Sequence, residues 1–409
     1  MNIVLRLAWR NLWRHPRRTW LTAGAMLFSN MLLVFMISFQ VGTYDLMINN
    51  TLQSFTGHMQ IQAPGYIDDM KMRQVVPDAE ALAEALRSEL AAESVAVRAA
   101  AFALASSDDR SFGIQVYGVQ PDHEPAVSNI PGLVKEGQFF SDTNAAEIVI
   151  GSVLARNLKV GLGDEITLLG SGRDGSFAAG VAIVTGIFES GVADIDRSIA
   201  EIPFGYFQDT FFMEGAAHEI VVTAQDLASV PLTQEKVQNF LSSKPELVLH
   251  DWNALQPGLR QAIQADMGSA FFMYGILVIL VAFSVLNTQL MSVLERTREF
   301  GIVMALGLTP GRLGRLVMLE TILMGAIGLV GGALLGLLVT GWFAIYGLSF
   351  PGMEDMAMQF NLPGRIYPKP TMLSVLGGPL VVFLFTLLAA IYPALRLRWL
   401  RPVEAMRAA

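Results

Sequence analysis

Four long stretches without a charged residue constrain this chain more than any other feature of its sequence. They cover 21–41, 268–294, 321–347 and 371–395. At about 1.5 Å of rise per residue, a helix of each length crosses the roughly 30 Å hydrocarbon core of a bilayer. Since 53% of the chain is hydrophobic and only 16% is charged, the sequence predicts a membrane protein whose first apolar stretch is an uncleaved anchor.

Basic residues near the ends of these stretches predict the orientation. Residues 1–18 hold five Arg and no acid, whereas 43–266 holds 13 basic and 30 acidic residues. Because cytoplasmic segments carry the excess of Lys and Arg, we expect both termini inside the cell and a large domain outside. The predicted organisation is a cytoplasmic amphipathic helix at 1–19, transmembrane helices at 20–42, 267–294, 317–347 and 371–395, an exported domain at 43–266, a cytoplasmic loop at 295–316, an outer loop at 348–370 and a cytoplasmic tail at 396–409.

The exported segment contains no Cys, so its own hydrophobic core must stabilise it without disulfides. Short apolar strands, turns and amphipathic helices alternate along it. We expect a mixed α/β lobe at 50–120 and 215–255, with a β-rich insertion at 125–212. The predicted fold class is therefore four transmembrane α-helices with a large mixed α/β domain between helices 1 and 2.

The loop ERTREFGIVMALGLTPGRLGRL at 295–316 carries six charges between two uncharged stretches. Its spacing predicts one short helix with a charged face around Arg298 and Glu299 and an apolar face around Phe300 and Met304. Gly307 and the turn after it would end this helix. From the residues alone, the loop is either an ordinary solvated connection or a surface that meets a soluble partner.

An apolar stripe at helical spacing extends the first and second spans beyond their apolar cores. Tyr44, Ile48 and Leu52 follow the first span, and Leu259 and Ile263 precede the second. This pattern predicts a paired helical stalk that carries the exported domain. Short amphipathic segments on the outer leaflet are the alternative.

Three glycines recur at four-residue spacing in the third span. Gly328, Gly332 and Gly336 form a face of small residues, which allows two helices to approach closely in a membrane. The spacing therefore predicts helix packing within the protein rather than a path for substrate.

The sequence lacks the usual marks of an enzyme. No P-loop motif occurs, so the chain has no such cradle for ATP phosphates, and the five His residues show no metal-ligand spacing. We expect no catalytic residue, bound cofactor, metal or nucleic acid. Within the spans we expect no buried acid or base, and we place Glu320 at a membrane boundary where it reaches water.

Three segments resemble one known family. ERTREFGIVMALGLTPGRLGRLVMLE, LAWRNLWRHPRRTWLTAGAM and the terminal RPVEAMRAA are similar to pieces of the MacB/FtsX/LolC-LolE family of ABC transporter permeases, the type VII or mechanotransmission family. Met406 departs from the Leu that is commoner in its motif. The layout of four spans with a large domain after the first also matches, so the resemblance extends over the full chain.

The resemblance implies that the loop is a coupling helix that docks on a separate ATPase subunit. The residues that it assigns to this role are Glu295, Arg296, Arg298, Glu299, Gly301, Ala305 and Gly307. ATP and Mg would bind to the ATPase dimer, and a second permease copy or a homologous permease would complete a transporter in the bacterial inner membrane.

The layout without a fused ATPase looks most like lipoprotein-releasing permeases. We therefore expect this protein to extract or release a lipoprotein or another lipid-bearing substrate from the inner membrane. The alternatives are an efflux permease that works with a periplasmic adaptor and a transmembrane regulator of a cell-wall hydrolase.

Overall fold

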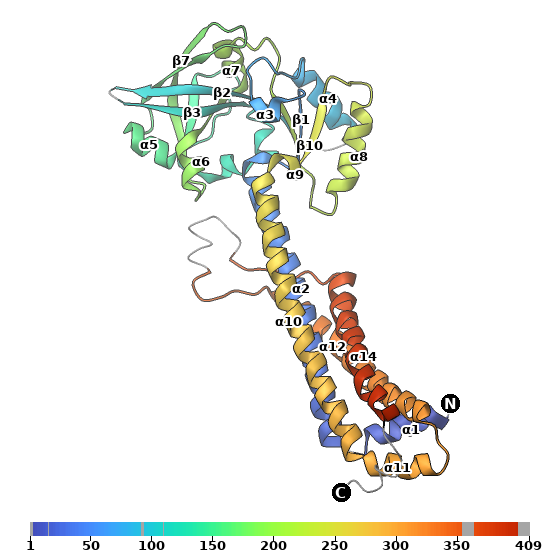
Figure 1. Cartoon of the computed structure of the whole chain (residues 1–409). Coiled ribbons are helices and arrows are strands. Elements are labelled where there is room, and N and C mark those ends of the chain that lie inside the picture. Colours follow the sequence, from blue (N-terminus) through green and yellow to red (C-terminus); the bar gives the residue numbers. More distant parts are fainter. Residues whose placement is uncertain (1–2, 15, 91–93, 109, 354–363, 400–409) are drawn as a thin grey trace. The chain divides into compact units, whose positions relative to one another are not determined.

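The computed structural model describes residues 3–14, 16–90, 94–108, 110–353 and 364–399 and divides into two units (Figure 1). The helical unit comprises Met1–Tyr44, Ile263–Ser349 and Arg365–Ala409. The α/β unit comprises Asp45–Ala262 and Phe350–Gly364. Each unit has its own core, and each is described separately below.

Among the described residues, four helices are long and apolar enough to cross a membrane, as predicted. Pro occupies the first position of α2, α10 and α12, where its fixed φ suits a helix start and its missing N–H costs nothing. The helices in chain order are α1 (Ile3–Leu12), α2 (Pro16–Thr51) with its π-helical extension η1 (Leu52–Thr56), α10 (Pro257–Glu295), α11 (Thr297–Ala305), α12 (Pro310–Tyr346), η4 (Leu373–Gly377) continuing into α14 (Gly378–Arg396), and η5 (Leu397–Trp399).

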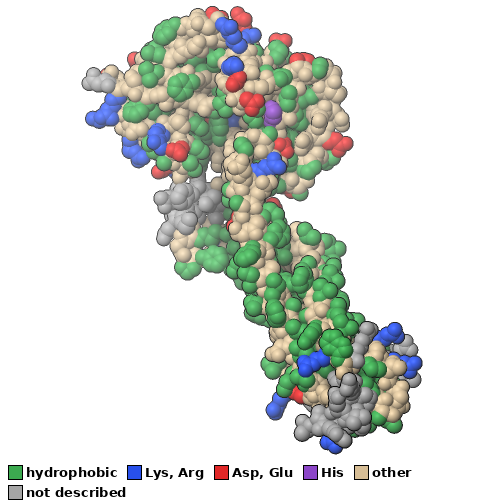
Figure 2. Space-filling model, in the orientation of Figure 1, with side chains coloured by type: hydrophobic (Ala, Val, Ile, Leu, Met, Phe, Trp, Pro, Cys, Tyr) green, Lys and Arg blue, Asp and Glu red, His purple; other side chains and the backbone are tan. Residues whose placement is uncertain are grey.

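Large apolar side chains from all four spans, including Met324 of α12, form the core of the helical unit. Met26 and Leu33 of α2 pack with Val281 and Val285 of α10 and with Val382 of α14. The opposite faces of the same helices are also apolar, and Figure 2 shows hydrophobic side chains over most of their visible surface, with Lys and Arg side chains near α1 and α11. An apolar outer surface of this kind suits a lipid environment.

The α/β unit is built on one ten-stranded sheet in the order β10-β1-β9-β2-β3-β8-β5-β7-β4, with β6 bonded to β2 and β7. The strands are β1 (Met59–Gln62), β2 (Val95–Ser107), β3 (Arg110–Val119), β4 (Val134–Gly137), β5 (Glu147–Gly151), β6 (Glu165–Ser171), β7 (Phe177–Phe188), β8 (Ile199–Pro203), β9 (Glu219–Val222) and β10 (Val248–Asp251).

Because β6 bridges β2 and β7, six strands close into a ring: β2, β3, β8, β5, β7 and β6. The first residues of β2 pair with β9, and its later residues pair with β6. Strand β2 therefore belongs both to the open part of the sheet and to the ring. The sequence assigns 50–120 to one lobe and 125–212 to another, whereas the structure makes the β2–β3 hairpin part of both.

Successive side chains of a strand point alternately into the ring and away from it, and the inward-pointing side chains fill its interior. In β7, Ala178, Ala182 and Val184 point inward and are buried, while Phe177 and Val181 are exposed. The surrounding helices are α3 (Tyr66–Asp69), α4 (Ala79–Leu90), η2 (Glu124–Ala126), η3 (Ile130–Leu133), α5 (Ser152–Leu158), α6 (Ala193–Ser198), α7 (Phe204–Phe211), α8 (Val230–Leu241) and α9 (Trp252–Leu255). The predicted fold class, four spans with a mixed α/β domain between the first two, is confirmed.

The terminal motif RPVEAMRAA lies outside the described residues.

Candidate functional site

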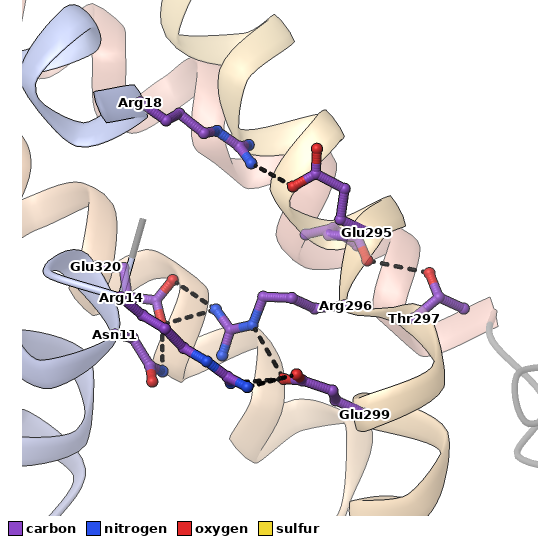
Figure 3. Close-up of polar contacts among 9 residues, drawn as sticks. Asn11, Arg14, Arg18, Glu295, Arg296, Thr297, Glu299 and Glu320 are labelled. Atoms are coloured by element: carbon purple, nitrogen blue, oxygen red, sulfur yellow. Dashed lines mark hydrogen bonds and ion pairs between the residues drawn. The ribbon is translucent and has the colours of Figure 1, made fainter. Parts of the chain in front are cut away.

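A cluster of polar side chains joins α1 and α2 to the helices around α11 (Figure 3). Its centre is Glu320 of α12, which is only 5% exposed. Asn11 donates from Nδ2 to Glu320 Oε1 over 2.7 Å, and Arg296 Nη1 lies 3.1 Å from the same oxygen and 3.2 Å from Oε2. A carboxylate that leaves water needs such charge-assisted bonds, because an unpaired buried charge is costly.

Two ion pairs at the edge of this cluster are more exposed. Arg14 lies 2.9 Å from a carboxylate oxygen of Glu299, and Arg18 lies 2.8 Å from one of Glu295. Arg18 also donates to the backbone carbonyl of Thr288 in α10. We call the seven residues Asn11, Arg14, Arg18, Glu295, Arg296, Glu299 and Glu320 the inner polar cluster. Their ion pairs join the N-terminal segment to the last residue of α10, Glu295, and to Glu299 in the first turn of α11.

Helix α11 has one packed face and one open face. Phe300 and Met304 are buried against α10, α12 and η5. On the open face, Arg298, Ile302 and Leu306 are exposed, and Leu306 reaches 83%. Exposed large apolar side chains around a charge are typical of a surface that a protein partner covers.

Gly307 ends α11 in a specific way. Its φ is +96°, in the left-handed region that a side chain disfavours. The Gly307 N–H donates to Met304 O over 3.0 Å, and the Leu308 N–H donates to Val303 O over 3.2 Å. This pair of bonds is the Schellman pattern, which satisfies the last carbonyls of a helix.

The predicted coupling residues therefore divide by their surroundings. Arg298, Ala305 and Gly307 are open to solvent. Gly301 is buried on the packed face and offers no surface to a partner. The remaining three, Glu295, Arg296 and Glu299, hold the helix through ion pairs inside the chain.

The expectation that Glu320 reaches water is wrong, because Asn11 and Arg296 enclose it. Sequence reasoning also missed Arg14 and Arg18 as partners of the loop and Asn11 as a partner of Glu320. One signal was present: Glu320 is the only acidic residue between Gly301 and Met353. A lone carboxylate at the end of an apolar span calls for a basic partner, and the loop offers four Arg residues, of which the structure pairs Arg296 with Glu320.

The glycine face of α12 lies against α2. A Cβ on Gly328 would lie 2.6 Å from Met26 Cβ, and one on Gly336 would lie 2.7 Å from Val34 Cβ. A Cβ on Gly332 would meet Asn30, whose Nδ2 donates to the Gly328 carbonyl over 3.0 Å. Side chains at these positions would force the two helices apart.

The predicted stalk residues fall on both sides of the division between the units. Tyr44 and Ile263 belong to the helical unit, whereas Ile48, Leu52 and Leu259 belong to the α/β unit. The Tyr44 hydroxyl donates to the Asp266 carboxylate over 2.6 Å, so α2 and α10 touch at this level of the helical unit. A stalk that moves as one body stays a prediction.

The helical unit contains an apolar cavity of about 520 Å³ among α2, α10, η4 and α14. Its polar groups lie together at one place: the Tyr274 hydroxyl donates to Gln40 Oε1 over 2.9 Å, and Gln40 Nε2 donates to the Tyr44 hydroxyl over 2.6 Å. The rest of the lining is aliphatic or aromatic side chains and glycine, among them Leu33 and Phe271. The cavity thus has the polarity pattern of an amphiphile.

Two family models match this chain. Residues 271–402 match the FtsX-like permease C-terminal model, and residues 19–240 match the MacB-like periplasmic core domain. The second match alone covers more than half of the 409 residues.

Three relatives agree with these matches. The lipoprotein-releasing system transmembrane protein LolC of Xylella fastidiosa is 25% identical over 302 residues, which are 71% of this chain and 72% of that protein. The corresponding LolE of Haemophilus influenzae is 25% identical and covers 72% of each chain. The pyoverdine export ATP-binding/permease protein PvdT of Pseudomonas entomophila is 26% identical over 69% of this chain and 41% of that protein. The resemblance seen in the sequence is thereby confirmed: this multi-pass inner-membrane protein belongs to the MacB/LolC-like, type VII family of ABC transporter permeases.

Proposed function

We propose that this permease couples ATP hydrolysis by a separate ATPase subunit to movements of its α/β unit, and that the open face of α11 is where the ATPase docks. The observation that carries the proposal is the exposure of Ile302 and Leu306 beside Arg298 on a helix whose other face is firmly packed. An apolar anchor next to a charge supplies both buried area and orientation to a protein contact.

The inner polar cluster supports this role because it holds α11 against the spans. Arg296 binds the buried Glu320 of α12, and Glu299 binds Arg14 in the segment before α2. A displacement of α11 would therefore be transmitted to α12 and to the segment before α2 through these ion pairs, and would not be absorbed by bending of the connecting residues. ATP and Mg would bind to the ATPase, since no P-loop occurs in these 409 residues.

The substrate that we propose is a lipoprotein or another lipid-bearing molecule. The apolar cavity of about 520 Å³ with its polar rim at Gln40, Tyr44 and Tyr274 supports an amphiphilic cargo, because it offers aliphatic surface to a chain and hydrogen bonds to a head group. The relatives whose names refer to lipoprotein release are similar over about 70% of their length. A second permease, either another copy or a homologue, would complete the transporter, with both termini in the cytoplasm.

Export of a soluble amphiphile together with a periplasmic adaptor is a second candidate. The similarity to a pyoverdine export protein favours it, and the same cavity would serve. The partners of the permease separate the two candidates: the first needs a lipidated protein as cargo, and the second needs an adaptor.

The experiment that tests the proposal is purification of the tagged permease in detergent, with mass spectrometry of the proteins and lipidated species that accompany it. We expect an ATPase subunit with a P-loop, together with a lipoprotein. An adaptor in place of the lipoprotein would support export, and purification without any ATPase would contradict the coupling proposal.

Variants of the open face locate the contact. Arg298→Glu combined with Leu306→Ser should abolish recovery of the ATPase, because both the charge and the apolar anchor are lost. Arg260→Glu in the α/β unit makes the same charge change at another exposed Arg and is the control. Reversal at Glu299 is a poor probe, because it also breaks the ion pair with Arg14.

A further inference from the structure

The end of the first-span helix is held by the α/β unit in an unusual way. The last four carbonyls of a helix normally lack a partner inside the helix. In η1 the Gly57 N–H donates to Leu52 O and the His58 N–H donates to Val222 O, so the carbonyls of residues 53–56 are left to other donors. The four donors are Asn129 N–H to Gln53 O (2.9 Å), Ser128 Oγ to Ser54 O (3.2 Å), Arg98 Nη1 to Phe55 O, and Gln60 Nε2 to Thr56 O (2.8 Å). We call these four residues, together with Glu124, which binds Arg98, the socket.

Arg98 is the charged centre of the socket, and it is completely buried. Its Nη2 and Nε donate to the two oxygens of Glu124 over 2.6 and 3.1 Å. Its guanidinium carbon lies 4.2 Å from the centroid of the Phe55 ring, which in turn packs edge-on against Tyr117 at 4.5 Å. A cation at this place also complements the negative end of the helix dipole.

The second crossing of the chain meets the same turn. Gln256, the residue before α10, donates from Nε2 to Thr56 Oγ1 over 2.8 Å. The end of the first-span helix and the start of the second-span helix are therefore tied to each other and to the sheet within one α/β unit.

Stability alone does not explain a buried Arg at this position. Replacing a buried ion pair by apolar residues of similar volume is often neutral or stabilising, because the pair must leave water. What an Arg supplies and an apolar residue lacks is a fixed fork of donors that binds Glu124 and the Phe55 carbonyl at the same time. The fork fixes the helix end against β2 in one orientation.

We propose that Arg98 is a positioning residue that fastens the end of the first-span helix to the sheet, so that a displacement of this helix moves β2 and the strands bonded to it. The inference rests on the proposed function, since it names the point where motion of the spans enters the α/β unit. Glu124 orients the fork, and the contacts of Ser128 and Asn129 prevent the helix end from turning.

The test uses the pair of substitutions Arg98→Met and Glu124→Met in the full chain. The single change Arg98→Met leaves Glu124 buried and unpaired, and the protein would then fail for a trivial reason. The double variant removes the fork together with the carboxylate that binds it. The buried Glu201 and Glu219 nearby, whose pKa values burial already raises, can take up a proton when Arg98 is absent, so the variant should fold. Arg87→Met is the matched control, because the Arg87 guanidinium also donates to a backbone carbonyl, Val95 O of β2, over 2.9 Å but makes no hydrogen bond to η1 among the described residues.

Two measurements are made on each variant. Hydrogen exchange of residues 53–58 in the detergent-solubilised permease reports the fastening itself. ATP turnover and ATP-dependent release of a fluorescent diacylated peptide from proteoliposomes, with the copurified ATPase, report coupling. A merely structural role would lower both activities in proportion to the amount of folded complex.

We expect the double variant to exchange the amides of residues 53–58 about tenfold faster. Its release per ATP should fall about tenfold while ATP turnover stays within about twofold of the parent. Unchanged exchange, or unchanged release per ATP, would overturn the inference. If the parent complex shows no ATP-dependent release, the proposed function fails, and the exchange measurement alone then decides whether Arg98 fastens the helix.

Discussion

The inner polar cluster and the socket each pair an Arg with a Glu. The first lies at the start of the first-span helix and the second at its end, and their surroundings differ. In the inner polar cluster, Arg14 and Glu299 are about half exposed, at 56% and 46% of their side-chain surfaces. In the socket, Arg98 and Glu124 are fully buried. Water screens the first pair and lets it open at little cost, whereas the second can be broken only by leaving a charge without solvent. The comparison indicates that the contact at the start of the first-span helix opens easily, whereas the contact at its end is rigid.

The largest expected effect is in the socket. Glu124→Gln leaves the Arg98 guanidinium buried without its counter-charge and should lower the free energy of unfolding of the α/β unit by about 3 kcal/mol. Hydrogen exchange of β2 in the full chain measures the change. Glu84→Gln, which removes the exposed partner of Arg87, is the control and should cost less than about 1 kcal/mol. Equal losses in the two variants would show that burial does not distinguish them.

The same region should respond to pH through Glu219, which faces Arg98 across the β2–β9 ladder. Burial raises the pKa of Glu219 to about 7: the positive charge of Arg98 offsets this rise only in part, and the negative charge of Glu124 adds to it. Burial also raises the pKa of the neighbouring Glu201, whose carboxylate oxygens have no hydrogen-bond partner among the described residues.

A raised acid pKa means that the folded state favours the protonated carboxyl. The stability that Glu219 contributes is therefore complete below pH 4.5 and is lost as the pH rises through about 7. In the parent, the free energy of unfolding should fall by on the order of 3 kcal/mol over this pH range because of Glu219, and Glu219→Gln should remove that fall. The measurement is the free energy of unfolding against pH for the parent and for the variant. Parallel profiles from pH 4 to pH 8 would contradict the assignment.

A smaller effect is expected at the buried centre of the inner polar cluster. Glu320→Gln removes the charge that Arg296 binds but keeps an acceptor for Asn11, and should lower unfolding stability by about 2 kcal/mol. Thermal unfolding of the purified permease in detergent checks this value. Asn11→Ala is the companion variant, and its loss should be nearer 1 kcal/mol because it removes a neutral donor; the reverse order would place the main interaction elsewhere.

The smallest effect is expected at the exposed pair. Arg14→Gln should change unfolding stability by less than about 1 kcal/mol, and salt near 1 M should abolish the difference. Arg17→Gln, an exposed Arg three residues further along, is the control. A loss of unfolding stability as large as that of Glu320→Gln would mean that the exposed pair of Arg14 and Glu299 also stabilises the fold strongly, and the contrast with the socket would disappear.

The sequence was sufficient for the spans and the fold class, because each rests on local pattern. Uncharged length predicts a span, and alternation with turn residues predicts strands. The closure of the ring through β6 was not predictable, because the pairing of β6 with β2 joins residues far apart in the chain, such as Leu104 and Leu169.

The candidate site was predictable only in its position. The position of α11 and its terminating Gly307 follow from residues next to one another. The role of Glu295 and Glu299 as partners of Arg18 and Arg14 depends on contacts across more than 270 positions. Similarly, Arg98 reads as one charged residue in an apolar strand, and only the structure brings Phe55 and Glu124 to it.

The two ends of the sheet bear on whether the α/β unit aggregates with other chains. The two strands at the free ends of the sheet, β10 and β4, are four residues long, and β4 contains the charged pair Lys135 and Glu136. Long, flat, apolar edges recruit extended chains from other proteins, and short or charged edges do not. The ends of this sheet therefore offer other extended chains little unpaired backbone on which to aggregate.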